Sequence, residues 1–541
     1  MQLRTMAPAM IACGLAACGG GSSSGPESNP LPAFTVSTST DAGLTLSPAT
    51  MSVEQGRQAT FTVITLPGRG VKALTGCGGQ LSGNTYTTAP ITSACAITGT
   101  SKPSYSISAI RLKPNALFHD EFATAPVLVE AVSSGAAGLK FYVEYLGNWF
   151  DHTAPSGIVK LPLFDDGTHG DRVANDGIYS AQISMGMTPL LRYHDRTVDR
   201  IPLTVYALDD AGNFAERTDT MNTQVNLGVV HRSLAVTTVS PGAGVHVASH
   251  MVNIVLPSAA NHSQEAMKKV YQYFPDVFDG FAVHLVGTTS FDNFPGGAAV
   301  RTGMQGTNQP VYDGSSAYGS SGVLFSSVYL NADIIGEVFN HEFGHATNFW
   351  LNKPQLDLTD GTGYHVGPST VQGQMGNSVV LRQQASGDFL TTYGTDDGQY
   401  YNRPFADIEL YLMGLLPPAS VGHEYFVLDK TVNTNNGAGV IIPRDKVAKV
   451  SIGDVIRVYG ERLPSVVTSQ KSFRFVFIAM SETPATPAEI AIINRVAAFQ
   501  ESASTGADFS SAGLFPVISM RPFRSATKGL GEMTTRLPGL R

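Results

Sequence analysis

Charged side chains and cysteine are both scarce in this chain. Asp, Glu, Lys and Arg make up 14% of its 541 residues, and the formal net charge is −8 at pH 7. The basic residues form no run, which argues against nucleic acid as a partner. No internal segment is long and apolar enough to cross a bilayer as a helix. The hydrophobic fraction of 43% is nevertheless ample for packed cores, and the length indicates three or four domains.

The N-terminal residues carry the pattern of an export signal. Arg4 supplies a weak positive charge, and a short apolar stretch follows at residues 6–17. The sequence Leu15-Ala16-Ala17-Cys18 then resembles the lipobox of bacterial lipoprotein signal peptides. This resemblance implies a signal peptide at residues 1–17, lipid on Cys18, and membrane attachment through that lipid. We therefore expect an exported lipoprotein of the cell envelope, at the outer membrane or cell surface; an ordinary secretory signal is the alternative.

A Gly- and Ser-rich segment is typical of a flexible tether, which we expect at residues 18–33. Since Cys13 would leave with the signal peptide and Cys18 would be acylated, Cys77 and Cys95 remain. An even pair in an exported chain predicts one disulfide. Zinc is an alternative for this pair, but no second Cys or His lies at ligand spacing. The bridge falls in a predicted small β module, residues 34–104.

A second β module is expected at residues 105–230, with strands at 139–143 and 201–207. Between these strands, residues 163–179 resemble part of an immunoglobulin-like sandwich domain of exported bacterial proteins, of the choice-of-anchor X type. Four carboxylates of this segment could bind Ca²⁺. Tight turns are the favoured role, because one hairpin loop supplies few of the six to eight oxygens that Ca²⁺ needs. The four residues are Asp165, Asp166, Asp171 and Asp176.

The most informative stretch is the HExxH sequence at residues 341–345. Apolar residues near helical spacing surround it; Asn331 or Asp333 can cap the start of a helix, and Pro354 marks its stop. On a helix, His341 and His345 share one face and can hold zinc, with Glu342 beside them as a general base. The alternative is a buried helix that carries these residues by accident, which would leave a costly unpaired glutamate.

A catalytic zinc usually has a third protein ligand. The extended HExxHxxGxxH pattern fails, because Asn348 and Leu351 occupy its Gly and last His positions. We prefer His365, whose imidazole suits zinc and whose flanking glycines let the backbone fold inward. Glu409, in a predicted helix at residues 404–414, is the alternative ligand, or it orients a ligand histidine from outside the metal shell. Asp360 also stays open, and Met375 or Met413 could lie beneath the metal or simply pack in the core.

Around the HExxH sequence, the pattern predicts helices at residues 264–274 and 487–500 and strands at 281–286, 322–330 and 473–480. Residues 331–418 resemble a set of bacterial secreted zincin-like proteins. This resemblance implies an α+β zincin-like metallopeptidase domain, which we expect at residues 231–541. In zincins, the sheet edge next to the active-site helix binds the substrate backbone by strand addition, and the 322–330 strand is our candidate for it. The predicted fold is therefore two all-β modules followed by an α+β domain.

The function predicted from these features is that of a zinc-dependent metalloendopeptidase with a protein or peptide substrate. One Zn²⁺ would be its cofactor, and Glu342 would take a proton from the zinc-bound water and pass it to the leaving amine. Two other functions stay open: a non-catalytic adhesion lipoprotein with a structural or vestigial zinc site, and a zinc hydrolase of a non-peptide amide. The stabiliser of the oxyanion is left open among Tyr393, Tyr400, Tyr401 and His423.

Overall fold

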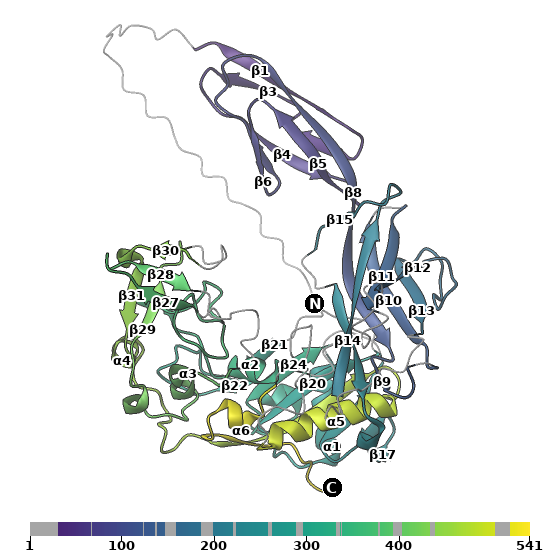
Figure 1. Ribbon diagram of the computed structural model, residues 1–541, viewed down its shortest axis with the longest axis vertical. Helices are drawn as coiled ribbons and strands as arrows, with labels where there is room; N and C mark the ends of the chain where they lie inside the picture. Colours follow the sequence, from purple (N-terminus) through teal and green to yellow (C-terminus); the bar gives the residue numbers. More distant parts are fainter. Residues whose placement is uncertain are drawn as a thin grey trace, which may run out of the picture. The chain divides into compact units, whose positions relative to one another are not determined.

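A computed structural model describes residues 31–541 apart from 67, 123, 136–137, 147–157, 185–197, 220–222, 258–261, 288–295, 332–335, 337, 377–378, 393–402, 433–438 and 504–519. The predicted signal peptide and Cys18 lie outside these residues. The chain divides into two compact units, Met1–Lys102 and Pro103–Arg541, and most of its regular structure is β-sheet (Figure 1). Among the described helices, none has the length and apolarity that crossing a membrane requires.

The first unit consists of two sheets that face each other across one core. One sheet contains β1 (Ala33–Thr40), β3 (Thr50–Glu54), β5 (Arg69–Gly76) and the start of β8 (Cys95–Lys113). The other has the order β2 (Leu44–Ser47), β4 (Thr60–Thr65), β7 (Thr85–Thr87), β6 (Gln80–Ser82). Burial alternates along β4, so that Phe61 and Val63 point into the core while their neighbours face solvent. This period of two explains why the apolar residues Phe61 and Val63 alternate with threonines in the sequence here.

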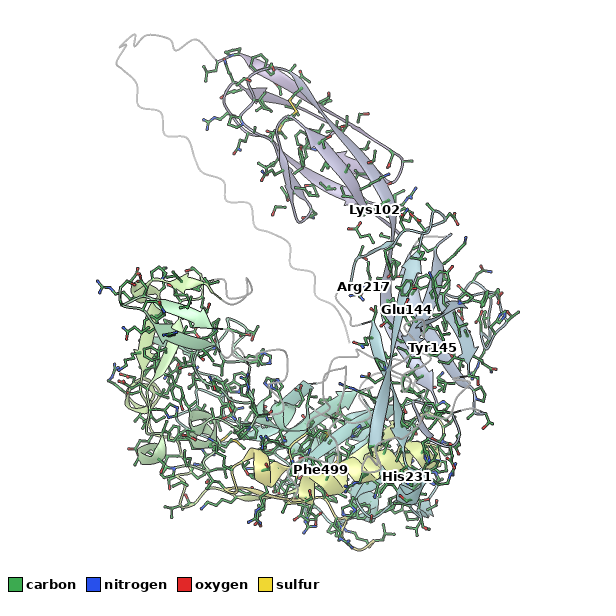
Figure 2. All side chains as sticks on the ribbon, viewed as in Figure 1. Lys102, Glu144, Tyr145, Arg217, His231 and Phe499 are labelled. Atoms are coloured by element: carbon green, nitrogen blue, oxygen red, sulfur yellow. A yellow bond between two sulfur atoms is a disulfide. The ribbon has the colours of Figure 1, made fainter. Side chains whose placement is uncertain are left out.

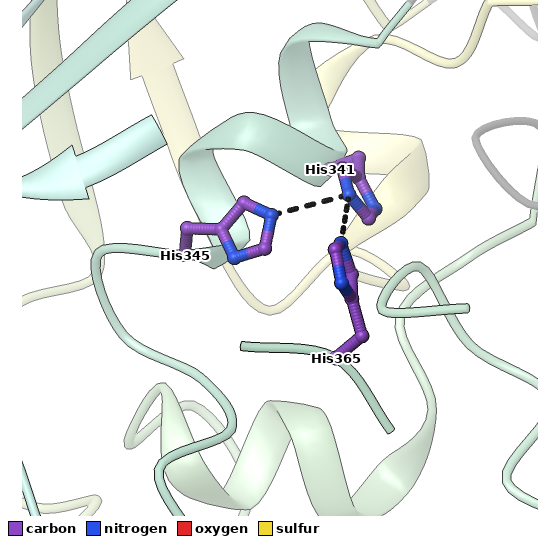
Figure 3. A group of neighbouring side chains, drawn as sticks. All are labelled: His341, His345 and His365. Atoms are coloured by element: carbon purple, nitrogen blue, oxygen red, sulfur yellow. Dashed lines mark hydrogen bonds between the residues drawn. The ribbon is translucent and has the colours of Figure 1, made fainter. Parts of the chain in front are cut away.

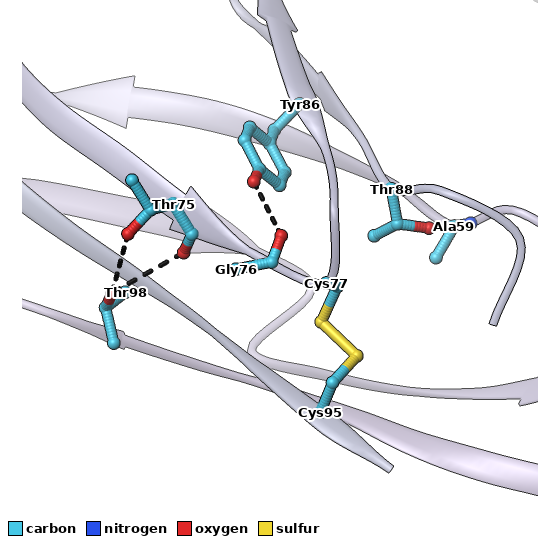
Figure 4. The surroundings of a disulfide bond; sticks show 8 residues. All are labelled: Ala59, Thr75, Gly76, Cys77, Tyr86, Thr88, Cys95 and Thr98. Carbon is cyan, nitrogen blue, oxygen red and sulfur yellow. Dashed lines mark hydrogen bonds between the residues drawn. A yellow bond between two sulfur atoms is a disulfide. The ribbon is translucent and has the colours of Figure 1, made fainter. Parts of the chain in front are cut away.

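The disulfide predicted between Cys77 and Cys95 is confirmed (Figure 4). The two Cα atoms are 5.6 Å apart, and the bridge joins the turn after β5 to the first residue of β8. Beside it, the Tyr86 hydroxyl donates a hydrogen bond of 2.7 Å to the carbonyl oxygen of Gly76. The bridge therefore closes a loop within a unit whose hydrophobic core is small.

We expect the Cys77→Ala/Cys95→Ala double variant to lower the free energy of unfolding of the first unit by about 3 kcal/mol, because the open chain gains loop entropy when it unfolds. Urea denaturation of the full chain measures the difference, as the shift of the unfolding transition that changes between wild type and variant. Alkylation without reductant provides the control, since the folded wild type must leave both thiols unlabelled. Equal unfolding midpoints for wild type and variant would contradict the prediction.

In the second unit, two further sheets pack across a common core. The first contains the end of β8, β10 (Val127–Gly135), β13 (Ile178–Ile183) and β15 (Glu216–Arg217). The second has the order β12 (Ile158–Leu163), β11 (Lys140–Leu146), β14 (Val198–Leu208), β16 (Gln224–Val230), β9 (Ala116–Phe118). Tyr105 of the first sheet meets the ring of Phe141 in the second edge-on, with ring centroids 5.3 Å apart.

The next sheet carries the candidate site. Its order is β17 (Val239–Gly242), β18 (Val245–Val247), β19 (Met251–Val255), β32 (Ser472–Ser481), β20 (Gly280–Val286), β24 (Ser326–Asn331), β21 (Gly296–Ala299), with β33 (Glu532–Thr534) beside β32. Strands β19, β32, β20 and β24 are parallel, whereas β21 runs antiparallel to β24. Helix α1 (Ser263–Tyr273) covers one face and helices α2 (Phe339–Gly344) and α5 (Pro487–Glu501) cover the other. Because both faces are buried, the central strands are almost continuously apolar.

Most of the remaining elements lie between β24 and β32 in the sequence. Residues from Phe349 to Tyr459 build a hydrophobic cluster of their own around α3 (Asp407–Leu412) and α4 (Ile452–Tyr459). Four small sheets complete the described part of this unit: β22 (Arg301–Thr302) with β23 (Tyr312–Asp313), β25 (Asn352–Lys353) with β26 (Leu356–Asp357), β27 (Val380–Gln383) with β28 (Phe389–Thr392) and β30 (Ile441–Ile442), and β29 (Tyr425–Leu428) with β31 (Val447–Val450). A short helix, α6 (Phe523–Ala526), precedes β33.

Helix α5 joins the predicted sandwich region to the rest of the second unit. Ala116 and Phe118 of β9 share a core with Phe499, which Figure 2 labels on α5. The buried carboxylate of Glu489 on this helix accepts the N–H of Asn115 at 2.9 Å and the N–H of Thr486 at 2.7 Å. Residues 103–541 consequently form one packed body, although the sequence indicates two domains within it.

Two details of the predicted α+β region are wrong. Asn331 cannot cap the HExxH helix, because it is the last residue of β24; the helix begins at Phe339 after Val338. The alternative cap Asp333 lies outside the described residues. The strand predicted at residues 322–330 is β24, which starts later and pairs with β20 on one side and β21 on the other. The edge strand beside α2 is therefore β21, whose sequence of two glycines and two alanines lacks a β-forming pattern.

Candidate metal centre

Helix α2 is fully buried, and its two faces make different contacts. Phe339 and Phe343 pack on the rings of Phe475 and Phe477 in β32. His341 and the helix C-cap His345 lie on a different face, as their four-residue spacing requires. The helix is short because the turns after Gly344 tighten and Phe349 adopts a left-handed backbone with φ of 56°. The packed phenylalanines thus fix the direction in which both imidazoles point.

His365 reaches the helix from a loop that folds back on itself. A bridge between Thr359 and Val366 closes this loop, and the N–H of Asp360 donates to the His365 carbonyl oxygen at 3.1 Å. Gly363, with φ of 83°, provides the left-handed turn just before His365. The loop carries the third histidine to the first two.

The three imidazoles converge on one point (Figure 3). The Nε2 atom of His341 is 3.2 Å from Nε2 of His365 and 3.2 Å from Nε2 of His345. One ligand atom from each of the three residues lies within 4.8 Å of the others. With zinc–nitrogen bonds of about 2.0–2.1 Å in a tetrahedron, two ligating nitrogens lie about 3.3–3.4 Å apart. The spacing of the Nε2 atoms therefore fits a zinc ion between them.

The second nitrogen of each ring has a partner that fixes the ring's orientation. Nδ1–H of His341 donates to the carbonyl oxygen of Gln374 at 2.5 Å, and the ring of His345 is hydrogen-bonded to the backbone of Tyr364. Nδ1 of His365 lies 3.6 Å from a carboxylate oxygen of Asp360. Metal-binding histidines almost always carry such outer partners. The proton of His341 sits on Nδ1, since a carbonyl only accepts, and Nε2 therefore presents its lone pair to the other two imidazoles.

Burial keeps these imidazoles in the neutral form that binds metal. Desolvation lowers the pKa of His341 to about 4 and that of His345 to about 2, and it also lowers the pKa of His365. Neutral rings whose Nε2 lone pairs converge repel one another unless a cation lies between them. The donor set thus supports a metal site on electrostatic as well as geometric grounds.

Glu342 lies beside this cluster. One carboxylate oxygen is 3.8 Å from Nε2 of His345, and the side chain is buried. Burial raises the pKa of Glu342 to about 8, and a cation held by the three imidazoles would lower this pKa again. The backbone of the same residue is pressed against β21, where a Cβ built on Gly297 would come within 1.7 Å of the Glu342 carbonyl oxygen. Gly297 is therefore required for the edge strand to lie directly on the HExxH helix.

The structure does not bring Glu409 to the three histidines; it places this side chain against backbone amides. Its carboxylate accepts the N–H groups of Gln374 at 3.0 Å, Met375 at 2.9 Å and Ala406 at 2.7 Å. Burial raises the pKa of Glu409 to about 7, and these amides act against that shift. Among the described residues, the third imidazole at the cluster comes from His365, which was our preferred ligand.

The other predicted site residues lie elsewhere. His423 contacts the Asp407 carboxylate at 3.9 Å and the ring of Tyr425. Met375 lies against the HExxH helix, since a Cβ on Gly344 would be 2.5 Å from its sulfur, while Met413 packs in the core around α5. The oxyanion candidates Tyr393, Tyr400 and Tyr401 lie outside the described residues.

Three of the four acidic residues considered for Ca²⁺ gather in one loop. Carboxylate oxygens of Asp165, Asp171 and Asp176 lie within 4.8 Å of one another. Asp165 accepts the N–H groups of Asp176 and Gly177, and Asp171 accepts that of Gly167 at 2.7 Å. These bonds are those of a turn held by its own aspartates.

The sequence does not predict two groups that hold the histidine rings, namely the backbone carbonyls of Gln374 and Tyr364. A carbonyl is present at every residue, so no side-chain pattern could have indicated them. No family model, curated protein or solved structure matches this chain. Function therefore has to be inferred from the residues of the site itself.

Proposed function

We propose that this protein is a zinc-dependent metalloendopeptidase of the zincin-like type, with His341, His345 and His365 as metal ligands. The observation that carries the proposal is the convergence of three Nε2 atoms, two of the separations being 3.2 Å, next to the carboxylate of Glu342. When bound, zinc supplies Lewis acidity, which polarises a carbonyl and makes a coordinated water molecule acidic. Residues 231–541 would be the zincin-like domain and residues 105–230 an immunoglobulin-like sandwich.

Glu342 is the residue that moves the proton. Its carboxylate accepts a proton from the attacking water at Oε and delivers it to the nitrogen of the leaving amine. The packing of Phe339 and Phe343 on β32 holds the helix, so that this carboxylate and the imidazoles keep their relative positions. The chain thus supplies a proton acceptor 3.8 Å from Nε2 of His345, next to the proposed metal site.

We propose that the substrate backbone binds to the sheet edge formed by β21. In the described part of the chain, β21 is the last strand of its sheet, and it touches α2 at Gly297. An extended peptide can add to such an edge through main-chain hydrogen bonds, which recognise any sequence. This arrangement favours a peptide or an unfolded protein segment as the substrate. We propose, from the sequence around Cys18, that a lipid anchors the enzyme at the cell envelope.

Metal removal tests this function. We expect the purified protein to contain one zinc per chain and to cleave an unfolded protein such as reduced casein. A chelator should abolish cleavage, and addition of zinc should restore it, because the ligands are preorganised by outer hydrogen bonds. Elemental analysis and gel electrophoresis of the substrate provide the two readouts. Stoichiometric zinc without cleavage of any peptide in a broad library would instead favour the adhesion protein with a structural zinc, and the absence of zinc would overturn the site.

A further inference from the structure

We infer that Glu409 is a positioning residue for the metal centre. Its carboxylate clamps the dipeptide Gln374-Met375, which contacts both the HExxH helix and the loop that carries His365. The inference rests on the proposed metal site. The carboxylate oxygens of Glu409 accept backbone N–H groups, so that this residue acts on the site through the backbone. Its role is therefore to fix where His341 and His365 stand relative to each other.

The clamp begins with a carboxylate that is wholly inside the protein. Glu409 has 0% of its surface exposed, and its two oxygens accept three main-chain N–H groups. Two of these donors are the consecutive amides of Gln374 and Met375. A buried carboxylate is costly unless such donors surround it, and each donor is in turn left unpaired if the carboxylate moves. The helix α3 and the dipeptide are thereby locked together.

From the dipeptide, two bonds run on to the metal ligands. The carbonyl oxygen of Gln374 accepts Nδ1–H of His341, and the carbonyl oxygen of Met375 accepts the N–H of Val366 at 3.1 Å, directly after His365. The Met375 side chain also lies against Gly344 of the HExxH helix. One dipeptide therefore touches the helix that carries two ligands and the loop that carries the third.

Gly373 shows how closely the clamp fits. A Cβ built on this glycine would lie 2.1 Å from one carboxylate oxygen of Glu409 and 2.4 Å from the other. Such an approach is impossible for any residue with a side chain unless the carboxylate is displaced. Gly373 thus provides a second, independent way to open the clamp without altering Glu409 itself.

The test is zinc affinity in Glu409→Gln and Gly373→Ala, measured by competition with a chromogenic chelator. The Gln amide puts an NH₂ group where a carboxylate oxygen accepts a backbone donor, so the dipeptide loses its anchor. We expect zinc to bind roughly 10–100-fold more weakly in both variants, as is typical when outer partners of a ligand are lost. Asp407→Asn is the matched control on the same helix, since Asp407 pairs with Lys528 and His423, and it should bind zinc like the wild type.

Cobalt provides a readout that loss of stability alone would not move. The visible spectrum of the Co²⁺-loaded protein reports ligand geometry, and it should change in Glu409→Gln and Gly373→Ala but not in Asp407→Asn. If the wild type binds zinc and both variants match it in affinity and in cobalt spectrum, the positioning role is overturned while the metal site stands. If the wild type binds no zinc, the proposed function itself fails.

A measurement on the wild type covers the case in which the variants do not fold. Hydrogen exchange of the metal-free protein should show strong protection of the Gln374 and Met375 amides, because both donate to a buried carboxylate. Exchange of these two amides as fast as in an exposed loop, in a protein that is otherwise folded, would overturn the clamp.

Discussion

Glu342→Gln should abolish most peptide hydrolysis while leaving the zinc in place. The amide has the size of the carboxylate but cannot accept the proton of the attacking water, so we expect kcat to fall by about 10²–10⁴-fold. Zinc content should stay at the wild-type level, because the three imidazoles are the proposed metal ligands and a Glu342 oxygen lies 3.8 Å from Nε2 of His345. The measurements are cleavage of a quenched fluorescent peptide and elemental analysis of the same sample.

A matched control comes from helix α1, where Glu265 is mostly exposed and pairs with His262. Glu265→Gln makes the same chemical change away from the cluster and should leave the rate unaltered. Unimpaired cleavage by Glu342→Gln would show that this carboxylate carries no proton in the reaction. Loss of zinc from Glu342→Gln would show instead that Glu342 is needed to hold the metal.

His365→Ala should remove most of the zinc. A site with three protein ligands becomes one with two, and we expect the affinity to fall by more than the roughly 10–100-fold that outer-partner changes cause. Activity should fall with the metal. Chelator competition measures the affinity, and the same assay on His341→Ala and His345→Ala should give losses of comparable size, since the three imidazoles are equivalent donors.

The comparison with His423→Ala makes this prediction specific. His423 is the other histidine after the HExxH sequence, and its partners are Asp407 and Tyr425. Its replacement should leave zinc affinity unchanged. Asp360→Asn should fall between the two, because Asp360 contacts His365 from outside the metal shell. If His365→Ala retained full affinity for zinc, His365 would not be a metal ligand.

The meeting of His341 and His345 on one face of the helix could be predicted from the sequence, because residues four apart on a helix lie side by side. His365 was reached from the donor chemistry of imidazole and from its flanking glycines. The choice between His365 and Glu409 depends on tertiary structure, namely on the carboxylate finding three amides on the dipeptide and at Ala406. Sequence spacing contains no information about such backbone partners.

The errors in the fold have similar causes. Apolar residues around the HExxH sequence predicted a longer helix, but Phe349 leaves the helical conformation and Asn331 belongs to a strand. The edge strand β21 consists of small residues because Gly297 must pass the backbone of α2 at contact distance. Close packing selected against the β-branched residues by which strands are usually recognised.

The hydrogen bond from Asn115 to Glu489 has a consequence for how such a protein can change over generations. A recombination event that replaced the β-rich segment before residue 231 would remove β9 and β16 from helix α5 and take the Asn115 N–H from the buried Glu489 carboxylate, which would keep the N–H of Thr486. We expect hybrid chains of that kind to fold less stably, even if each donor segment came from a stable protein. Selection should therefore pass residues 103–541 on as a single inherited block.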